Sequence, residues 1–416
     1  MKSYHYEIKH IPLEQEELLL KETIFHTANG YIGIRGCFEE GYPAGMQSIR
    51  GTYINGFYDF ARMEQAEKLC GLIEEKQTIL NIADTQSIKL YLDGETFSMF
   101  EGTVEESSRS LDMQKGYTLR TVLWTSPAGK KVEIRIKRMA SFVWLPLFLI
   151  DYSVRALNFQ GKIRFESLHS AEVENYFNPN DPRVAAERAK YLEPAHAEAI
   201  VIASYNSFPA VSNFSNMTYL ESKTVSSGLF VGSGVCHHLS AGACSETMQE
   251  IDHKYITHIE TDIAQGETIT LLKYSVFADS IRQANCKDAV IESMKAVTAL
   301  PVEKLYQAQE EYLERYWKRN TVEIQGDDDL NLAVHYNMYQ LLQSVAGMEA
   351  IAVIRQETPA KCTVGLRSRD LVDVGSIAAS FGGGGHKNAA GLSVAGTIDE
   401  FKPKILKAFE DIFSAS

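Results

Sequence analysis

The sequence predicts a protein that is mainly β over its first part and ends in a small α/β domain. Residues 1–270 consist of short segments in which polar and apolar residues alternate, with turn residues between them. Residues 280–345 then change to a helical period, and a strand-rich segment with four consecutive glycines follows residue 350. We therefore expect a large antiparallel β-sandwich, a helical linker and a small α/β domain.

The strand predictions rest on alternation and on turn residues. Ser87–Phe97 alternates and turns at Asp93-Gly94, which is a hairpin signal. Val132–Lys137 alternates without interruption, so one of its faces is expected to be buried. Asp262–Ala278 gives two strands around a Gln-Gly turn. These segments predict a sandwich domain over residues 1–278.

Two helices are expected to form a linker over residues 279–326. Pro301 suits the first turn of the second helix. Val322-Glu323-Ile324 is predicted as a short strand. Asp327 then opens a further helix, assigned to residues 327–346, because three aspartates sit where a helix dipole is positive. Its apolar residues recur at helical spacing and predict one buried face: Leu332, Tyr336, Tyr339 and Leu342.

The chain changes style near residues 343–350, and residues 347–416 are predicted as a separate domain. Asp373 is placed to cap a short helix, Val374–Ser380, and Thr397 and Glu400 have the spacing of a capping box before a last helix. Charge changes at the same place. Residues 350–416 carry eight basic and seven acidic residues, hence +1 of the total of −13, and the preceding residues carry −14.

Composition limits the function classes. A chain of 416 residues with 45% hydrophobic and 23% charged residues is ordinary for a globular protein of two or three domains. The net charge of −13 argues against a duplex nucleic-acid binder. Six scattered cysteines, no apolar signal core and no membrane-length apolar run predict a cytoplasmic protein without a membrane partner. The string Cys236-His237-His238, with Cys244, lacks metal-site spacing, so no metal is expected there.

The sharpest local motif is FGGGGHKNAAG, Phe381–Gly391. Glycines can take positive φ and turn their amides toward one point, and such a nest binds anions. The alternative is a flexible glycine loop at a helix end. Because an arginine fork and a histidine accompany the glycines, we predict a phosphate or nucleotide site. Its residues are Arg367, Ser368, Gly382, Gly383, Gly384, Gly385 and His386.

This segment resembles the C-terminal domain of DHH-family phosphoesterases, of the nanoRNase and phosphoadenosine-phosphate phosphatase type. The matching stretches are Gly365–Ser368, Val372–Val374 and Phe381–His386 with Ala389–Gly391. The resemblance implies a domain that holds the phosphate or nucleotide of a substrate against a separate domain, which in the family binds manganese through an Asp-His-His run. No Asp-His-His occurs in this sequence.

Residues 1–346 resemble the front of glycoside hydrolase family 65, the kojibiose, maltose and trehalose phosphorylases. The residues that carry this resemblance are Glu22 with Phe25–Gly36, Gly51–Asp59, Leu111–Met113 with Gly116, Asn178–Val184, Trp317 and Asp328–Ser344. The resemblance implies a β-sandwich, linker helices and the first helix of an (α/α)6 barrel. It also implies phosphorolysis of an α-glucosyl disaccharide, with inorganic phosphate as co-substrate and a barrel glutamate as acid.

No catalytic residue can be assigned in this chain, because that glutamate and the phosphate site belong to the barrel. The adjacent acids Glu39-Glu40 and Glu105-Glu106 are interpreted as solvated surface. Three hypotheses remain: a family 65 phosphorylase that is inactive in this form, a module that binds phosphate or short nucleotides beside carbohydrate, and an accidental fusion of two fragments. A helix without its barrel partners favours self-association, so a homo-oligomer is among the expected states.

Overall fold

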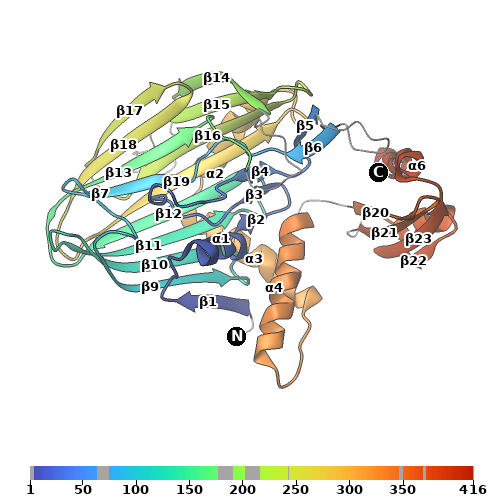
Figure 1. Cartoon of the computed structure of the whole chain (residues 1–416), viewed down its shortest axis with the longest axis horizontal. Coiled ribbons are helices and arrows are strands. Elements are labelled where there is room, and N and C mark those ends of the chain that lie inside the picture. The colour runs from blue at the N-terminus through green and yellow to red at the C-terminus, as the bar shows by residue number, and fades with distance from the viewer. Residues whose placement is uncertain are drawn as a thin grey trace. The chain divides into compact units, whose positions relative to one another are not determined.

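The computed structural model describes residues 4–62, 75–176, 191–201, 216–241, 243–345, 350–368 and 372–415. The chain divides into two compact units, Met1–Ser344 and Val345–Ser416 (Figure 1). We call them unit 1 and unit 2 and describe each by itself.

Unit 1 is built on a nine-stranded antiparallel sheet whose strand order is β1-β9-β10-β11-β12-β19-β16-β15-β14 (Figure 1). The first strand, β1, pairs with β9, consecutive strands are neighbours from β9 through β12, and β19 then joins the two halves of the sheet. The strands are β1 (His5–Lys9), β9 (Thr103–Asp112), β10 (Tyr117–Thr125), β11 (Lys131–Ala140), β12 (Leu147–Ala156), β14 (Leu192–Ile200), β15 (Met217–Thr224), β16 (Phe230–Leu239) and β19 (Thr268–Asp279).

A five-stranded sheet of order β17-β18-β13-β7-β8 supplies the second layer. Its strands are β7 (Ile88–Leu92), β8 (Glu95–Thr96), β13 (Gly161–Ser170), β17 (Ser245–Ile251) and β18 (Lys254–Ile263). Smaller elements complete the front of the unit: α1 (Gln15–Ile24), the three-stranded sheet of β2 (Thr27–Ala28), β3 (Ile32–Ile34) and β4 (Thr52–Ile54), and the pair β5 (Tyr58–Arg62) with β6 (Glu75–Ile79).

The core of unit 1 lies between the two sheets, as the alternation predicts. In β11, Val132, Ile134 and Ile136 are at most 1% exposed, while the residues between them are not buried. They pack with residues of the second sheet such as Leu90 and Phe165. The hairpin predicted at Asp93-Gly94 is present between β7 and β8, and both turn residues have the positive φ that a tight hairpin requires.

Three helices follow the sandwich. Helix α2 (Cys286–Thr298) begins at Asn285, whose side chain accepts a hydrogen bond from the Asp288 amide, and it packs on the outer face of the nine-stranded sheet. Helix α3 (Val302–Asn320) follows Pro301, as predicted. Helix α4 (Asp328–Val345) packs within unit 1, where the His335 ring stacks on Tyr4 with centroids 4.0 Å apart. The predicted strand at residues 322–324 is wrong, since these residues form no strand.

Unit 2 is a four-stranded sheet of order β20-β21-β23-β22 with helices packed on one face. Its elements are β20 (Ala350–Thr358), β21 (Lys361–Ser368), α5 (Val374–Ser380), β22 (Gly384–His386), β23 (Ala389–Ala395) and α6 (Ile398–Ala415). Asp373 caps α5 through the Ser376 amide, and the Thr397 hydroxyl and Glu400 carboxylate form the predicted capping box. The predicted fold class, mainly β with a large antiparallel sandwich and a small α/β domain, is confirmed.

Candidate functional site

The predicted phosphate-site residues lie in unit 2 at one end of its sheet. Arg367 and His386 are on different strands, but both are paired with Ala389, which lies between them. Directly paired residues project from the same face of a sheet, and adjacent strands lie about 4.8 Å apart, so the two Cα atoms are separated by about 10 Å. Both side chains are exposed. The open face of the sheet therefore carries a guanidinium and an imidazole facing the same side.

Three glycines lie in the next row of this open face. Gly365, Gly391 and Gly384 are directly paired across β21, β23 and β22. A Cβ atom added to Gly365 or Gly384 would meet nothing within 4 Å. A Cβ atom would therefore fit at both positions, so the packing of the fold does not require glycine there. The row forms a flat floor without side chains beside Arg367 and His386, and we call it the glycine floor.

The four consecutive glycines do not form the predicted anion nest. The Gly382 and Gly383 amides donate hydrogen bonds to the Ala379 and Ala378 carbonyl oxygens, at 3.0 and 2.8 Å. Together with the positive φ of Gly382, these bonds make a Schellman cap at the end of α5. Gly384 and Gly385 belong to β22. The predicted convergence of all four amides on one point is wrong, because the helix cap uses the amides of Gly382 and Gly383. The assignment of the residues to a phosphate site stays a prediction.

Ser368 has a structural task at the same place. Its hydroxyl donates to the Val372 carbonyl oxygen at 2.6 Å, and its backbone amide donates to the Asn388 carbonyl oxygen at 3.1 Å. The Arg367 guanidinium donates to the carbonyl oxygen of Leu366 at 2.7 Å, which leaves other N–H groups of its fork available. Of the predicted set, Arg367 and His386 are therefore the two side chains that the structure presents to a ligand on the open face.

The glycine floor itself was not predicted from the sequence. In the sequence, Gly365 and Gly391 stand out only as members of the stretches that resemble the DHH family. A glycine inside a strand indicates that a ligand or another backbone approaches closely, and both Gly365 and Gly391 lie inside strands. The strand register that aligns them with Gly384 is a long-range property, and it could not be read from the local pattern.

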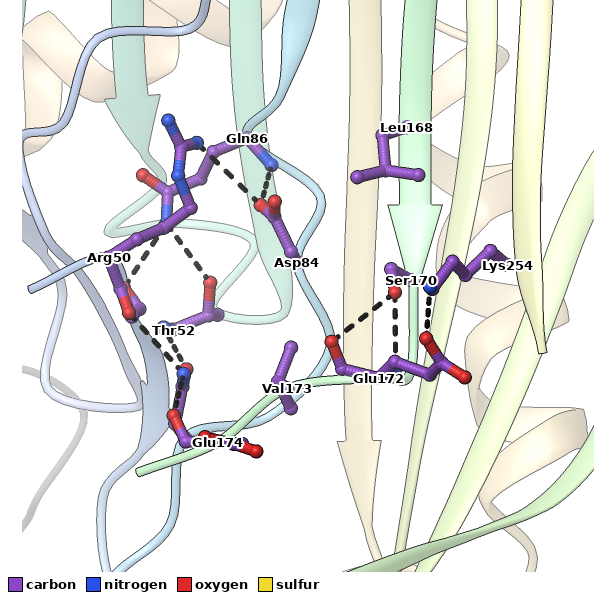
Figure 2. Close-up of a pocket in the computed structure, with 12 residues that line it drawn as sticks. Arg50, Thr52, Asp84, Gln86, Leu168, Ser170, Glu172, Val173, Glu174 and Lys254 are labelled. Atoms are coloured by element: carbon purple, nitrogen blue, oxygen red, sulfur yellow. Dashed lines mark hydrogen bonds and ion pairs between the residues drawn. The ribbon is translucent and has the colours of Figure 1, made fainter. Parts of the chain in front are cut away.

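Unit 1 has a polar pocket of about 380 Å³ at the edge of the sandwich. Figure 2 shows Arg50, Thr52, Asp84 and Gln86 on one side and Ser170, Glu172 and Lys254 on the other. The two sides meet where the backbones of Asp84 and Ser170 exchange hydrogen bonds of 2.9 and 3.0 Å.

The polar groups of this pocket are engaged with one another. Asp84 accepts hydrogen bonds from the Ser87 hydroxyl and the Gln86 amide, and the Arg50 guanidinium is 3.9 Å from its carboxylate. Burial raises the pKa of Asp84, but Arg50 and these hydrogen bonds outweigh it and hold the pKa below its usual value. Glu172 forms an ion pair with Lys254. Asp84 is thus ionised at neutral pH and cannot serve as a general acid, which must carry a proton.

A buried lysine lies directly behind the pocket. Lys273 on β19 is fully buried, and its ammonium nitrogen lies 2.7 Å from the Leu168 carbonyl oxygen and 3.2 Å from that of Ser87. Burial lowers its pKa to about 7, and the nearby Asp84 offsets part of this shift. Its cross-strand neighbour His237 is also buried, and its pKa lies well below the usual value because of burial and the lysine charge.

Adjacent acids that we interpreted as solvated are in fact buried. The Glu39 and Glu40 side chains are 2% and 3% exposed. Both bind the Arg120 guanidinium, with nitrogen–oxygen distances of 2.7 Å to Glu39 and to one Glu40 oxygen. The interpretation as surface is wrong for Glu39 and Glu40, because these residues lie on a loop that folds between the sheets and encloses both side chains. Glu105 is exposed and pairs with Lys131, as expected of surface.

The residues that carry the family 65 resemblance have structural roles where the structure describes them. Glu22 is 1% exposed and accepts hydrogen bonds from the Ser48 hydroxyl and the Ile49 amide at 2.6 and 3.0 Å. The Trp317 indole donates to the Met113 carbonyl oxygen at 2.8 Å. Asn178–Val184 lies outside the described residues. Within the described ranges there is no cluster of three or more His, Cys, Asp or Glu side chains that could hold a metal ion.

Unit 1 shares its fold with a protein of solved structure. A solved structure, "Putative kojibiose phosphorylase from human microbiome", matches 81% of this chain with a TM-score of 0.67 at 18% identity, and 41% of that chain is covered. Residues 9–316 match "Glycosyl hydrolase family 65, N-terminal domain". The chain therefore belongs to glycosyl hydrolase family 65. Residues 320–415 match the "DHHA1 domain".

Curated relatives agree with this assignment. The chain is 32% identical over 343 residues to "Alpha,alpha-trehalose phosphorylase" of Geobacillus stearothermophilus, a match that covers 80% of this chain and 42% of the relative. It is 34% identical over 329 residues to the same enzyme of Thermoanaerobacter brockii, with 78% and 41% covered. It is 26% identical to "Kojibiose phosphorylase" of Halothermothrix orenii, with 77% and 38% covered. The chain spans about two fifths of the length of these relatives.

Helix α4 is assigned differently by the structure and by the second family match. The structure joins it to unit 1, whereas the second family match begins at residue 320 and includes it. Its assignment to a catalytic barrel stays a prediction. Across the described parts of the chain, no helix is long and apolar enough to cross a membrane.

Proposed function

We propose that this chain is a family 65 protein that does not itself carry out phosphorolysis. The parent reaction is the splitting of an α-glucosyl disaccharide by inorganic phosphate into β-glucose 1-phosphate and glucose. Residue 350 already belongs to β20 of unit 2, where the resemblance calls for barrel helices that carry the glutamic acid and the phosphate site. The state of Asp84 in the sandwich pocket supports the proposal, because its pKa is held below the usual value and an ionised carboxylate cannot donate a proton.

A turnover assay on the purified chain tests this proposal. Maltose, kojibiose and trehalose are each offered with inorganic phosphate, and a family 65 trehalose phosphorylase serves as the positive control. We expect no glucose 1-phosphate above the rate of a blank. Release of glucose 1-phosphate that persists through purification would show that acid and phosphate groups exist outside a barrel, and the proposal would be wrong.

A second function is favoured by the open face of unit 2. We propose that this face binds the phosphate group of a short nucleotide, with Arg367 and His386 as donors and the glycine floor beneath the ligand. A guanidinium fork matches phosphate oxygens in two parallel hydrogen bonds, which a lysine cannot reproduce. Hydrolysis is not part of the proposal, since the sequence has no Asp-His-His run for manganese.

Calorimetric titration with phosphoadenosine phosphate and with a dinucleotide tests the second function. A Cβ atom at Gly365 would meet nothing within 4 Å, so we expect Gly365→Val to fill the floor and abolish binding while the unit stays folded. Arg367→Lys should weaken binding about tenfold or more, because charged hydrogen bonds contribute about 1.5–3 kcal/mol each. Arg355→Lys, an exposed arginine paired with Thr363 on the same face, is the matched control and should bind normally.

The outcomes separate the remaining hypotheses. Binding that is unaffected by Gly365→Val would place the ligand elsewhere, and no binding of either nucleotide would leave the accidental fusion of two fragments as the better account.

We also propose a reducing, cytoplasmic location. None of the five cysteines in the described ranges is in a disulfide, and four of them are buried, which fits thiols in a reducing compartment.

A further inference from the structure

A groove of about 270 Å³ on unit 1 shares no lining residue with the polar pocket. It runs between helix α2 and the loop that precedes β12. Its floor is apolar and is formed by Leu147, Val276 and Val297, each at most 1% exposed. Its rim carries three groups of a different kind: Trp144, Glu292 and Ser293.

Trp144 differs from the other tryptophans of the chain. The indole N–H groups of Trp124 and Trp317 donate to the Glu101 and Met113 carbonyl oxygens, at 2.7 and 2.8 Å. The indole N–H of Trp144 has no acceptor among the described residues, and its ring is only partly buried. A tryptophan N–H that is not bonded within the protein remains available to a ligand.

The loop that carries Trp144 is held firmly. The Ser141 hydroxyl oxygen accepts hydrogen bonds from the Val143 and Trp144 amides, at 3.2 and 3.0 Å. The Asn29 side-chain amide donates to the carbonyl oxygens of Ser141 and Leu145, at 2.6 and 2.8 Å. A binding group on such a loop loses little freedom when a ligand arrives, which favours affinity.

Helix α2 presents the opposite rim. Glu292 and Ser293 lie one helical turn before Ala296 and Val297, so the four residues share one face of the helix. Glu292 is exposed, and neither it nor Ser293 has an ion pair or a side-chain hydrogen bond among the described residues. The rim therefore offers one N–H donor, one hydroxyl and one carboxylate acceptor, none of which is needed by the fold.

We propose that this groove binds a single neutral pyranose ring. A pyranose has an apolar face of ring C–H groups, which matches the apolar floor and the indole ring, and a rim of hydroxyls that act as donors and acceptors. The carboxylate accepts from two neighbouring hydroxyls, the indole N–H donates to a third, and Ser293 can do either. The volume suits one sugar ring and is small for a drug-sized or nucleotide ligand. The absence of a basic side chain from the lining argues against an anionic sugar.

Fluorine NMR of the full chain labelled with fluorotryptophan tests this proposal, because the sequence has three tryptophans. Trp144→Phe assigns the Trp144 resonance. Titration with glucose or maltose should move that resonance in a saturable way and leave those of Trp124 and Trp317 in place. Sorbitol, which has the hydroxyls but no ring, should move none of them.

Variants locate the hydrogen bonds. Glu292→Gln should weaken glucose binding about tenfold or more, since a hydrogen bond to a charged acceptor is worth about 1.5–3 kcal/mol. Glu303→Gln, which alters another acid on the linker helices outside the groove, is the matched control and should have no effect. The proposal is overturned if glucose leaves the Trp144 resonance unmoved, if sorbitol moves it equally, or if Glu292→Gln binds glucose as the unaltered chain does.

Discussion

Units 1 and 2 place their charged side chains in opposite ways. Unit 1 buries a network between its sheets, in which Arg120 holds Glu39 and Glu40 and Lys273 is fully enclosed. In the described part of unit 2, no charged side chain is buried, and the core formed by the sheet, α5 and α6 is apolar. Its Arg367 and His386 stay on the open sheet face.

This difference shows which polar groups are free to meet a ligand. A buried charge must be paired and hydrogen-bonded inside the protein, so it has little left to offer another molecule. Unit 1 has enough interior to enclose such a network, whereas a unit of about 70 residues buries too little surface to compensate for it. We therefore expect ligands to bind at polar groups that have no partner within the protein, on the open face of unit 2 and at Trp144 in unit 1.

Breaking the buried network should change the unfolding free energy of unit 1 more than any other substitution considered. Arg120→Met leaves two carboxylates, each at most 3% exposed, without their guanidinium. Removal of one partner from a buried ion pair costs about 3–5 kcal/mol. All three tryptophans lie in unit 1, so urea denaturation followed by tryptophan fluorescence reports on this unit alone.

The exposed Arg135 on β11 of unit 1 supplies the control for this measurement. Arg135→Met should change the fluorescence midpoint by less than the equivalent of about 0.5 kcal/mol, as surface substitutions usually do. If Arg120→Met cost under about 1 kcal/mol, water would have to reach Glu39 and Glu40, and the contrast between the two units would fail.

Lys273 should make the stability of unit 1 depend on pH. Its pKa falls from 10.5 in the unfolded chain to about 7 in the folded protein, so between these values the unfolded state binds more protons. Stability therefore rises with pH in this window, by about 2 kcal/mol between pH 7 and pH 9. Below pH 7 both states carry the proton and the full penalty of burying the charge is present.

Lys273→Met should remove this dependence. The variant has no charge to bury, so the rise of the unfolding free energy from pH 7 to pH 9 should be absent from it, as measured by urea denaturation at each pH. Burial raises the pKa of the Cys37 and Cys286 thiols from 9.0 to about 11, which lowers stability slightly near pH 9, but this effect is the same in both proteins and cancels in their difference. An equal pH slope in the unaltered chain and in Lys273→Met would assign the effect to another group.

The sandwich could be predicted because local pattern and burial agree there. Val132–Lys137 alternates in sequence, and the structure buries every second residue of it. The buried network could not be predicted in this way. The neighbouring acids Glu39 and Glu40 lie on a loop, and Arg120 is 80 residues further along the chain. Only the tertiary packing of the loop between the sheets makes both acids internal.

The site in unit 2 was predicted in its residues but not in its geometry. The glycine run, Arg367 and His386 could be selected as candidates because their chemistry suits phosphate. The roles of individual glycines depend on what each touches, and sequence alone treats the four as equivalent. In the structure they divide into two that cap α5 and two that build β22.

Replacing single glycines should distinguish the glycines that the fold needs from those that it does not. The expected changes in the stability of unit 2 are the smallest of those predicted for this protein. A Cβ atom on Gly383 would lie 2.4 Å from the Gly391 carbonyl oxygen and from the Leu392 Cβ, whereas one on Gly384 would meet nothing within 4 Å. Gly383→Ala should therefore destabilise unit 2 by about 1–2 kcal/mol through overpacking. Gly384→Ala should be neutral within about 0.5 kcal/mol.

Unit 2 contains no tryptophan, so amide hydrogen exchange of β23 is the appropriate measurement. Faster exchange in Gly383→Ala, with unchanged exchange in Gly384→Ala, would show that the fold needs one glycine and leaves the other to a ligand. If both variants exchanged faster, Gly384 would also be structural. The glycine floor would then contain no glycine shown to be dispensable for the fold, and it would not differ from an ordinary strand in this respect.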